Sequence, residues 1–209
     1  MEFALEHTDQ NTAARACRLA LAHGVVETPV FMPVGTQGVV KALTARQLEE
    51  LDARIILGNT YHLFLRPGSE LIGNAGGLHR LTGWSGPILT DSGGYQVYSL
   101  ARLRKLNDTG VTFQSHIDGT TFTFTPEQVV GIQEGFGVDI MMQLDECPPA
   151  DAPKQQIEAA VDRSAVWAQR SCDAWSREAS ELFAIVQGGL HVDLRQKSAE
   201  LLAGLELPG

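Results

Sequence analysis

The stretch of this sequence best suited to chemistry is residues 90–96, Thr-Asp-Ser-Gly-Gly-Tyr-Gln, which follow a short apolar run at residues 87–89. The apolar run predicts the end of a buried strand. The paired glycines allow the backbone to turn sharply and to approach a ligand closely. Asp91 and Ser92 are therefore expected at the carboxyl end of a strand, where α/β folds place their chemistry, and Tyr95 offers a ring for stacking. Asp-Ser-Gly-Gly is also common turn chemistry, but the whole stretch after a buried strand favours a functional role.

Polar or small residues also follow three other apolar runs: Asn59, Asp145, Cys147, Gln187 and Gly188. The carboxyl ends of neighbouring parallel strands meet at one edge of a sheet, so these residues are expected to gather around Asp91. An alternative for Asp145 is a cap at a strand–helix junction.

Together these side chains match the edge of guanine. Guanine presents donors at N1 and at its exocyclic amine, which the carboxylates of Asp91 and Asp145 would accept. Its O6 is an acceptor, which the Gln187 amide or a backbone N–H of the following glycines would satisfy. The ring of Tyr95 would stack on the base. The sequence therefore predicts a purine pocket.

The elements that position this pocket alternate between strand and helix. Apolar runs predict strands at residues 3–5, 17–21, 30–34, 54–59, 87–91, 138–144 and 182–186. Helices are expected at residues 44–51, at 67–75, from 125 onward, at 153–179 and at 192–203. The later strands are continuous apolar runs, as a parallel sheet covered by helices requires.

Two details sharpen this pattern. Thr44 and Thr125 are predicted helix N-caps, with Gln47 completing a capping box after the first. The long helix carries one core-facing stripe: Ile157, Ala160, Val161, Ala165, Ala168, Cys172 and Trp175.

Residues 111–117 and 121–124 interrupt the alternation, because they read as a hairpin inserted after the third βα strand and joined at Asp118-Gly119-Thr120. A doubly wound sheet and a (β/α) barrel would both fit the remainder. No GxGxxG follows the first strand, and polar residues end four strands in succession, which favours a TIM-type barrel mouth. Five units cannot close an eight-stranded barrel.

Composition limits the class of protein. The 209 residues are 44% hydrophobic and 20% charged, with a net charge of −9, which argues against a generic nucleic-acid coat. The scattered cysteines Cys17, Cys147 and Cys172 show neither disulfide nor zinc spacing, which favours a cytoplasmic protein. No signal peptide and no run of ~20 apolar residues is apparent, so a soluble protein with no membrane partner is expected.

Six motifs give the chain a family resemblance: TDSGGYQ, GNTYHL (58–63), PVGTQGVVKAL (33–43), QSHIDG (114–119), LDEC (144–147) and IVQGG (185–189). They resemble the queuine tRNA-ribosyltransferases, or tRNA-guanine transglycosylases, over essentially the whole chain. The resemblance implies a (β/α)₈ barrel that exchanges guanine at the tRNA wobble position for a 7-deazaguanine in queuosine biosynthesis. The implied partners are tRNA with a wobble guanine, and guanine or 7-aminomethyl-7-deazaguanine.

The resemblance also implies roles for individual residues. Asp91 would recognise the base and act as general acid and base, Asp145 and Gln187 would be further base contacts, and Tyr95 would be the stacking ring. Cys147, beside Asp145, looks like the bacterial form of the pocket.

One departure from the family pattern bears on activity. In the family, a later aspartate attacks the ribose and a Cys/His zinc site follows it, both after further βα units. Residues 1–209 are therefore expected to form one incomplete barrel of about five units, with no metal of its own because the zinc ligands would lie beyond Gly209. Alone, the chain is expected to be inactive and to need a homodimer or a separately supplied C-terminal part.

Two other classes of function fit the same residues. The chain could be a non-catalytic accessory subunit that binds tRNA or a partner, although retention of Asp91, Asp145 and Gln187 argues against this. It could also be a purine-binding barrel hydrolase or lyase, which purine binding without tRNA binding would favour.

Overall fold

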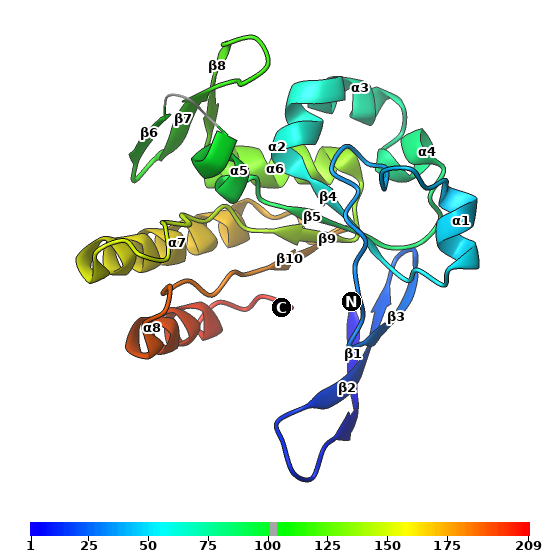
Figure 1. Ribbon diagram of the computed structural model, residues 1–209, viewed down its shortest axis with the longest axis horizontal. Coiled ribbons are helices and arrows are strands. Elements are labelled where there is room, and N and C mark those ends of the chain that lie inside the picture. The colour runs from blue at the N-terminus through cyan, green and yellow to red at the C-terminus, as the bar shows by residue number, and fades with distance from the viewer. Residues whose placement is uncertain (101–103) are drawn as a thin grey trace.

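A parallel sheet lies at the centre of the computed structural model, which describes residues 1–100 and 104–209 (Figure 1). Its strand order is β10-β9-β5-β4, from β10 (Glu181–Phe183), β9 (Ile140–Met142), β5 (Ile88–Asp91) and β4 (Ile56–Asn59). All three pairings are parallel. The predicted α/β fold with a parallel sheet is confirmed. Within the described residues this sheet has four strands and is not closed into a barrel.

Helices follow the strands, as the alternation predicts. They are α1 (Ala45–Glu50), α2 (Thr60–Leu63), α3 (Ser69–Asn74), α4 (Leu78–Thr82), α5 (Gly94–Leu100), α6 (Pro126–Phe136), α7 (Lys154–Ala174) and α8 (Val192–Ala203), with a π-helical turn η1 (Phe64–Gly68) between α2 and α3. Figure 1 shows α7 between α6 and α8, each packed on its neighbour. The main core cluster lies between helices and sheet and includes Ile72, Phe136 and Met141.

Most predicted helices are confirmed, with changes at their ends. Thr44 and Thr125 are N-caps, and both form complete capping boxes. The stripe of α7 faces the core, but the helix ends at Ala174. Trp167, which the stripe did not include, is fully buried. The helix expected at residues 67–75 corresponds to α3, and an additional helical segment begins at Thr60 and is interrupted at Arg66, whose backbone is extended.

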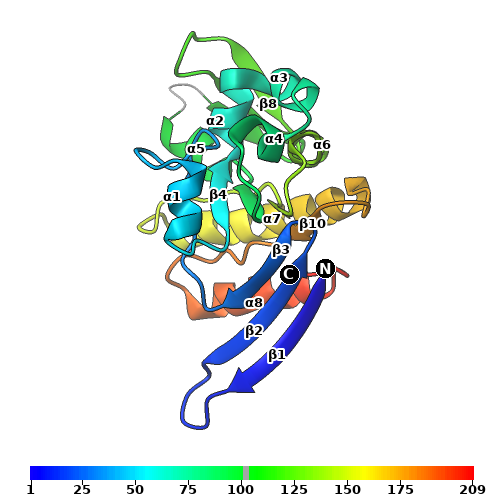
Figure 2. The same cartoon turned by 90° about the vertical axis from the view of Figure 1, so that its right-hand side faces the viewer.

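A separate antiparallel sheet is formed by β1 (Glu2–Thr8), β2 (Arg15–Leu21) and β3 (Gly24–Thr28). Figure 2 shows this sheet extending away from α2 and α3. The strand predicted at residues 30–34 is wrong as a full strand, because only Val34 forms a parallel bridge, to Leu57. Pro29 and Pro33 have no N–H to donate, which limits pairing in this segment.

The predicted hairpin is confirmed as part of a third sheet, although its first strand ends at Gln114 and not at residue 117. It comprises β7 (Gly110–Gln114) and β8 (Thr121–Phe124), with β6 (Arg104–Asn107) as an additional antiparallel strand. Its apolar face, including Phe113 and Phe124, packs with Tyr61 of α2 and Trp167 of α7. The insertion is therefore anchored to the helices around the carboxyl edge of the parallel sheet. None of the helices that the structure describes has the length and apolar character of a membrane span.

Candidate functional site

Asp91 ends β5 and is held by four N–H donors. One carboxylate oxygen accepts from the side-chain amides of Asn59 and Gln96, the latter at 2.9 Å. The other accepts from the backbone N–H groups of Thr60 at 3.0 Å and Gly93 at 3.1 Å. The pairing of β4 with β5 places Asn59 opposite Asp91. The carboxylate is thus fixed in orientation before any ligand arrives.

Burial raises the pKa of Asp91, and this effect outweighs the hydrogen bonds from Asn59, Thr60, Gln96 and Gly93, which lower it. Hydrogen bonds to a carboxylate favour its charged form, whereas burial disfavours it. A carboxyl group with a raised pKa takes up a proton more readily than an ordinary aspartate does, which is a property of general acids and bases.

Asp145 is 7% exposed and follows β9. Its two oxygens accept hydrogen bonds from Ser92 Oγ at 2.9 Å and from Gln187 Nε2 at 2.6 Å. Burial raises its pKa to about 6, opposed by those two hydrogen bonds and assisted by the negative charge of Asp91. All its side-chain partners are neutral, so the cost of burying this charge is only partly offset.

The backbone at Gly94, three residues after Asp91, lies close to the backbone of Asp145. A Cβ added to Gly94 would lie 2.5 Å from the carbonyl oxygen of Asp145, so a larger residue could not occupy this position without displacing the loop. The N–H of Gly94 also donates to Ser92 Oγ at 3.1 Å, which orients the hydroxyl that meets Asp145. Gly94, the second glycine of the sequence motif, therefore lets the segments that follow β5 and β9 approach each other.

Gln133, on α6, ties β5 to β9 and was not predicted as a site-supporting residue. It is fully buried, and its Oε1 accepts from Thr90 Oγ1 at 2.9 Å and from the Met142 N–H at 3.2 Å. Its Nε2 donates to the Met142 carbonyl at 2.9 Å. A glutamine four residues after Val129 on a core-facing helix stripe was the signal that could have identified it.

The remaining predicted site residues are Tyr95, Cys147 and Gly188. The side chain of Tyr95, on α5, is 60% exposed. Cys147 is half-buried, and burial together with nearby Asp145 raises the pKa of its thiol. Gly188 is buried with φ +125°, and an added Cβ would lie 2.5 Å from the backbone nitrogen of Arg195. Packing against α8 thus requires glycine at Gly188.

The inserted sheet β6–β8 also contacts the carboxyl edge of the parallel sheet. The contact is made by residues that were not predicted as site residues. The Tyr61 hydroxyl lies 2.8 Å from Nδ1 of His116, which is part of the loop between β7 and β8. The His62 ring packs edge-on against both Tyr61 and His116. Burial and the neighbouring His116 lower the pKa of His62, while Asp91 raises it. The polar run Asn59–His62 was the available signal for this contact.

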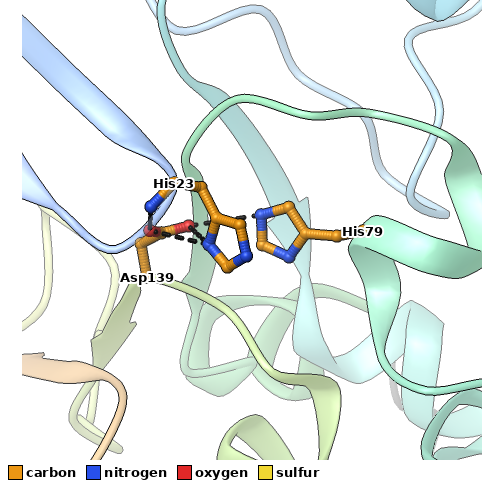
Figure 3. A group of neighbouring side chains, drawn as sticks. All are labelled: His23, His79 and Asp139. Atoms are coloured by element: carbon orange, nitrogen blue, oxygen red, sulfur yellow. Dashed lines mark hydrogen bonds and ion pairs between the residues drawn. The ribbon is translucent and has the colours of Figure 1, made fainter.

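Within the described ranges, one group of three potential metal ligands lies at the opposite, amino end of the sheet: His23, His79 and Asp139 (Figure 3). Hydrogen bonds engage both carboxylate oxygens of Asp139 without a metal. Asp139 accepts from the backbone N–H groups of His23 at 2.9 Å and Ile88 at 3.0 Å. Nδ1 of His23 lies 3.1 Å from Oδ1 of Asp139, and Nε2 of His79 lies 3.3 Å from Oδ2.

The geometry of the two imidazoles does not fit a shared ion. Their rings stack with centroids 3.6 Å apart and planes 18° from parallel, so their in-plane lone pairs cannot converge on one metal. Both nitrogens of His79 also face backbone carbonyls, of Gly137 and Gly86, each at 3.1 Å. A carbonyl only accepts a hydrogen bond, so a His79 nitrogen that donates to one of them offers no lone pair to a metal. We therefore interpret this cluster as a polar clamp.

Comparison with known proteins identifies the family to which the chain is similar. A family model described as queuine tRNA-ribosyltransferase matches residues 9–209. Proteins with this same name are similar to the chain: one from Desulforudis audaxviator is 56% identical over 96% of the chain and 54% of its own length. Those from Dehalococcoides mccartyi and Synechococcus elongatus are 52% and 50% identical over 99% and 100% of the chain, and 53% and 54% of their own lengths. The chain spans about half the length of the curated relatives it matches.

Proposed function

The chain belongs to the queuine tRNA-ribosyltransferase family, and from this premise we propose that the whole protein exchanges guanine at the tRNA wobble position for a 7-deazaguanine during queuosine biosynthesis. The observation that carries the proposal is the hydrogen-bonded group of Asp145, Ser92 and Gln187 beside Asp91. It places two carboxylates and an amide at one edge of the parallel sheet, as recognition of a guanine-type base requires.

The proposed base contacts follow from donor and acceptor chemistry. The carboxylate of Asp145 accepts from the N1–H and exocyclic amine of the base. The amide of Gln187 and the backbone at Gly188 meet O6, and the exposed ring of Tyr95 stacks on the base. In this arrangement Cys147 lines the pocket and Asn59 acts through Asp91, whose carboxylate it contacts.

We assign the proton transfers to Asp91. A base that leaves the ribose carries away negative charge, and protonation by a positioned acid relieves it. The base that enters must lose a proton, which the same group can accept. The raised pKa of Asp91 and its four fixed hydrogen bonds suit a group that is oriented for both steps.

The open sheet supports the finer part of the fold proposal, a TIM-type barrel. Its two edges are β10 and the segment that bridges β4 at Val34. Apolar side chains are exposed near both: Phe31 and Val34 at one, and Leu190 at the other. We propose that further βα units cover these edges and supply the ribose-attacking aspartate and zinc ligands that the family resemblance implies.

Guanine exchange into tRNA tests this proposal. We expect full-length protein to incorporate labelled guanine into tRNA, and the 209-residue chain to self-associate and to lack exchange activity on its own. Exchange should return when the remaining units are co-expressed as a second polypeptide. An Asp91→Asn variant of the full-length protein should lose roughly 2–4 kcal/mol of transition-state stabilisation. Because the amide also brings a donor among the four N–H groups that hold Asp91, its melting temperature should fall, and exchange is therefore compared at a temperature where both proteins are folded.

Three outcomes would contradict parts of the proposal. Binding of tRNA without exchange by the full-length protein would indicate an accessory subunit. Binding of purine without tRNA would indicate a barrel hydrolase or lyase. Exchange by a monomeric 209-residue chain would show that the chain needs no further units.

A further inference from the structure

Ser198 is a buried residue of α8 with a direct contact to the candidate site. It is 3% exposed, and its Oγ accepts a hydrogen bond from the backbone N–H of Gln187 at 3.0 Å. Gln187 lies in the loop between β10 and α8, so the helix that follows the strand holds the loop that leads into it. The base contacts proposed above make no use of this hydroxyl.

The preceding βα unit has the same arrangement. Ser164 of α7 is 2% exposed, and its Oγ accepts from the backbone N–H of Glu146 at 3.0 Å. Glu146 immediately follows Asp145 in the loop after β9. A buried hydroxyl costs free energy unless it is hydrogen-bonded, and in both units the bond made is to a loop that carries a site residue.

The position of Gln187 contributes to the charge state of Asp145, together with burial and the hydrogen bond from Ser92. Gln187 Nε2 donates to Asp145 at 2.6 Å, and this hydrogen bond lowers a pKa that burial raises. Because Asp145 is 7% exposed, water has little access to replace a lost donor. A displaced Gln187 would therefore leave the carboxylate less stable and more readily protonated.

We propose that Ser198 is a positioning residue: it fixes the backbone of Gln187 so that the Gln187 amide meets both Asp145 and the bound base. The identity of the base rests on the proposed function. The coupling between Ser198 and Asp145 does not, because it is a property of the protein without ligand.

The test compares Ser198→Ala with a matched control, Ser171→Ala. Ser171 is a fully buried serine of α7 whose Oγ has no hydrogen-bond partner among the residues described. The first measurement is the titration of the Asp145 carboxyl by carbon-13 NMR without ligand. Ser198→Ala should raise its midpoint by about half a unit to one unit, since one neutral hydrogen bond is lost, whereas Ser171→Ala should leave it unchanged.

The second measurement is guanine exchange by the full-length protein. Ser198→Ala should raise the KM for guanine about tenfold with kcat changed less, because it weakens a contact to the bound base. Ser198→Thr, which keeps a hydroxyl, should restore both the midpoint and KM. If Ser198→Ala does not fold, Ser198→Cys fills the space with a weaker acceptor and should shift the midpoint in the same direction.

The outcomes separate the two proposals. An unchanged Asp145 midpoint in the folded Ser198 variants would overturn the positioning role, whatever the exchange assay shows. So would an equal shift in Ser171→Ala, because that would reflect general loosening of the helix layer. If the wild-type protein shows no guanine exchange but Ser198→Ala still shifts the Asp145 midpoint, the proposed function is overturned and the coupling between Ser198 and Asp145 is supported.

Discussion

Strand β9 has a buried aspartate beyond each of its ends, and the two carboxyl groups are held in opposite ways. Asp139 precedes the strand and is 1% exposed, while Asp145 follows it and is 7% exposed. Burial raises the pKa of Asp139, but hydrogen bonds from His79, Ile88 and His23 outweigh it and lower the pKa overall. At Asp145, burial prevails and raises the pKa to about 6.

The partners explain the difference. Asp139 accepts two backbone N–H groups and contacts the imidazoles of His23 and His79. Asp145 accepts from a hydroxyl and an amide, and the charge of Asp91 adds repulsion. Burial alone therefore does not fix the role of a carboxylate. At the amino end, the hydrogen bonds of the fold offset the cost of burying the Asp139 charge. At the carboxyl end, the protein's own hydrogen bonds offset this cost for Asp145 only in part.

Asp139→Asn should produce the largest effect, a loss of about 3–5 kcal/mol in the free energy of unfolding. The amide keeps the shape but brings a donor into a site that already holds the N–H groups of His23 and Ile88. Because the pKa of Asp139 is lowered in the folded state, the carboxylate stabilises the fold above about pH 4, and this stabilisation is lost as pH falls through the folded pKa. Urea denaturation should therefore show that the difference in the free energy of unfolding between wild type and variant becomes smaller in acid. A difference below about 1 kcal/mol at pH 7 would contradict the clamp.

Asp145→Asn should act in the opposite direction. The folded state holds its proton up to about pH 6, so between about pH 4 and 6 it binds more protons than the unfolded state. The wild-type free energy of unfolding therefore falls as pH rises through this window. The variant lacks this dependence, so its stability relative to wild type should grow by about 2–3 kcal/mol from pH 4 to pH 7 and then level off. If the difference in the free energy of unfolding between variant and wild type did not change with pH, the raised pKa of Asp145 would be contradicted.

Tyr95→Ala should have the smallest effect on folding. The ring is 60% exposed, so the free energy of unfolding should change by less than about 0.5 kcal/mol. Base binding should nevertheless weaken by about 1–3 kcal/mol, because the stacking surface is lost. Calorimetric titration with guanine measures this binding, and Tyr95→Phe, which keeps the stacking ring, is the matched control. Equal affinity in the alanine and phenylalanine variants would exclude stacking on Tyr95.

The sequence was sufficient to predict the carboxyl end of the sheet but not the amino end. Asp91 follows an apolar run and precedes two glycines, so its place at a strand end was visible from adjacent residues. The contact between His23 and Asp139 joins residues 116 positions apart, and no local pattern indicates it. Gln133 was missed for the same reason, since its contacts cross from α6 to two strands. The strand expected at residues 30–34 failed because its apolar pattern took no account of two prolines.

Titration of both carboxyl groups in one sample is the most direct test of the contrast between the two ends of β9. Carbon-13 labelling of the aspartate side chains, with Asp139→Asn and Asp145→Asn used to assign the two signals, would give both midpoints by NMR. We expect the Asp145 midpoint near pH 6 and the Asp139 midpoint below the ordinary value of 3.8. Midpoints that coincide, or an Asp139 midpoint above that of Asp145, would contradict the assignment of one aspartate to the fold and the other to the ligand.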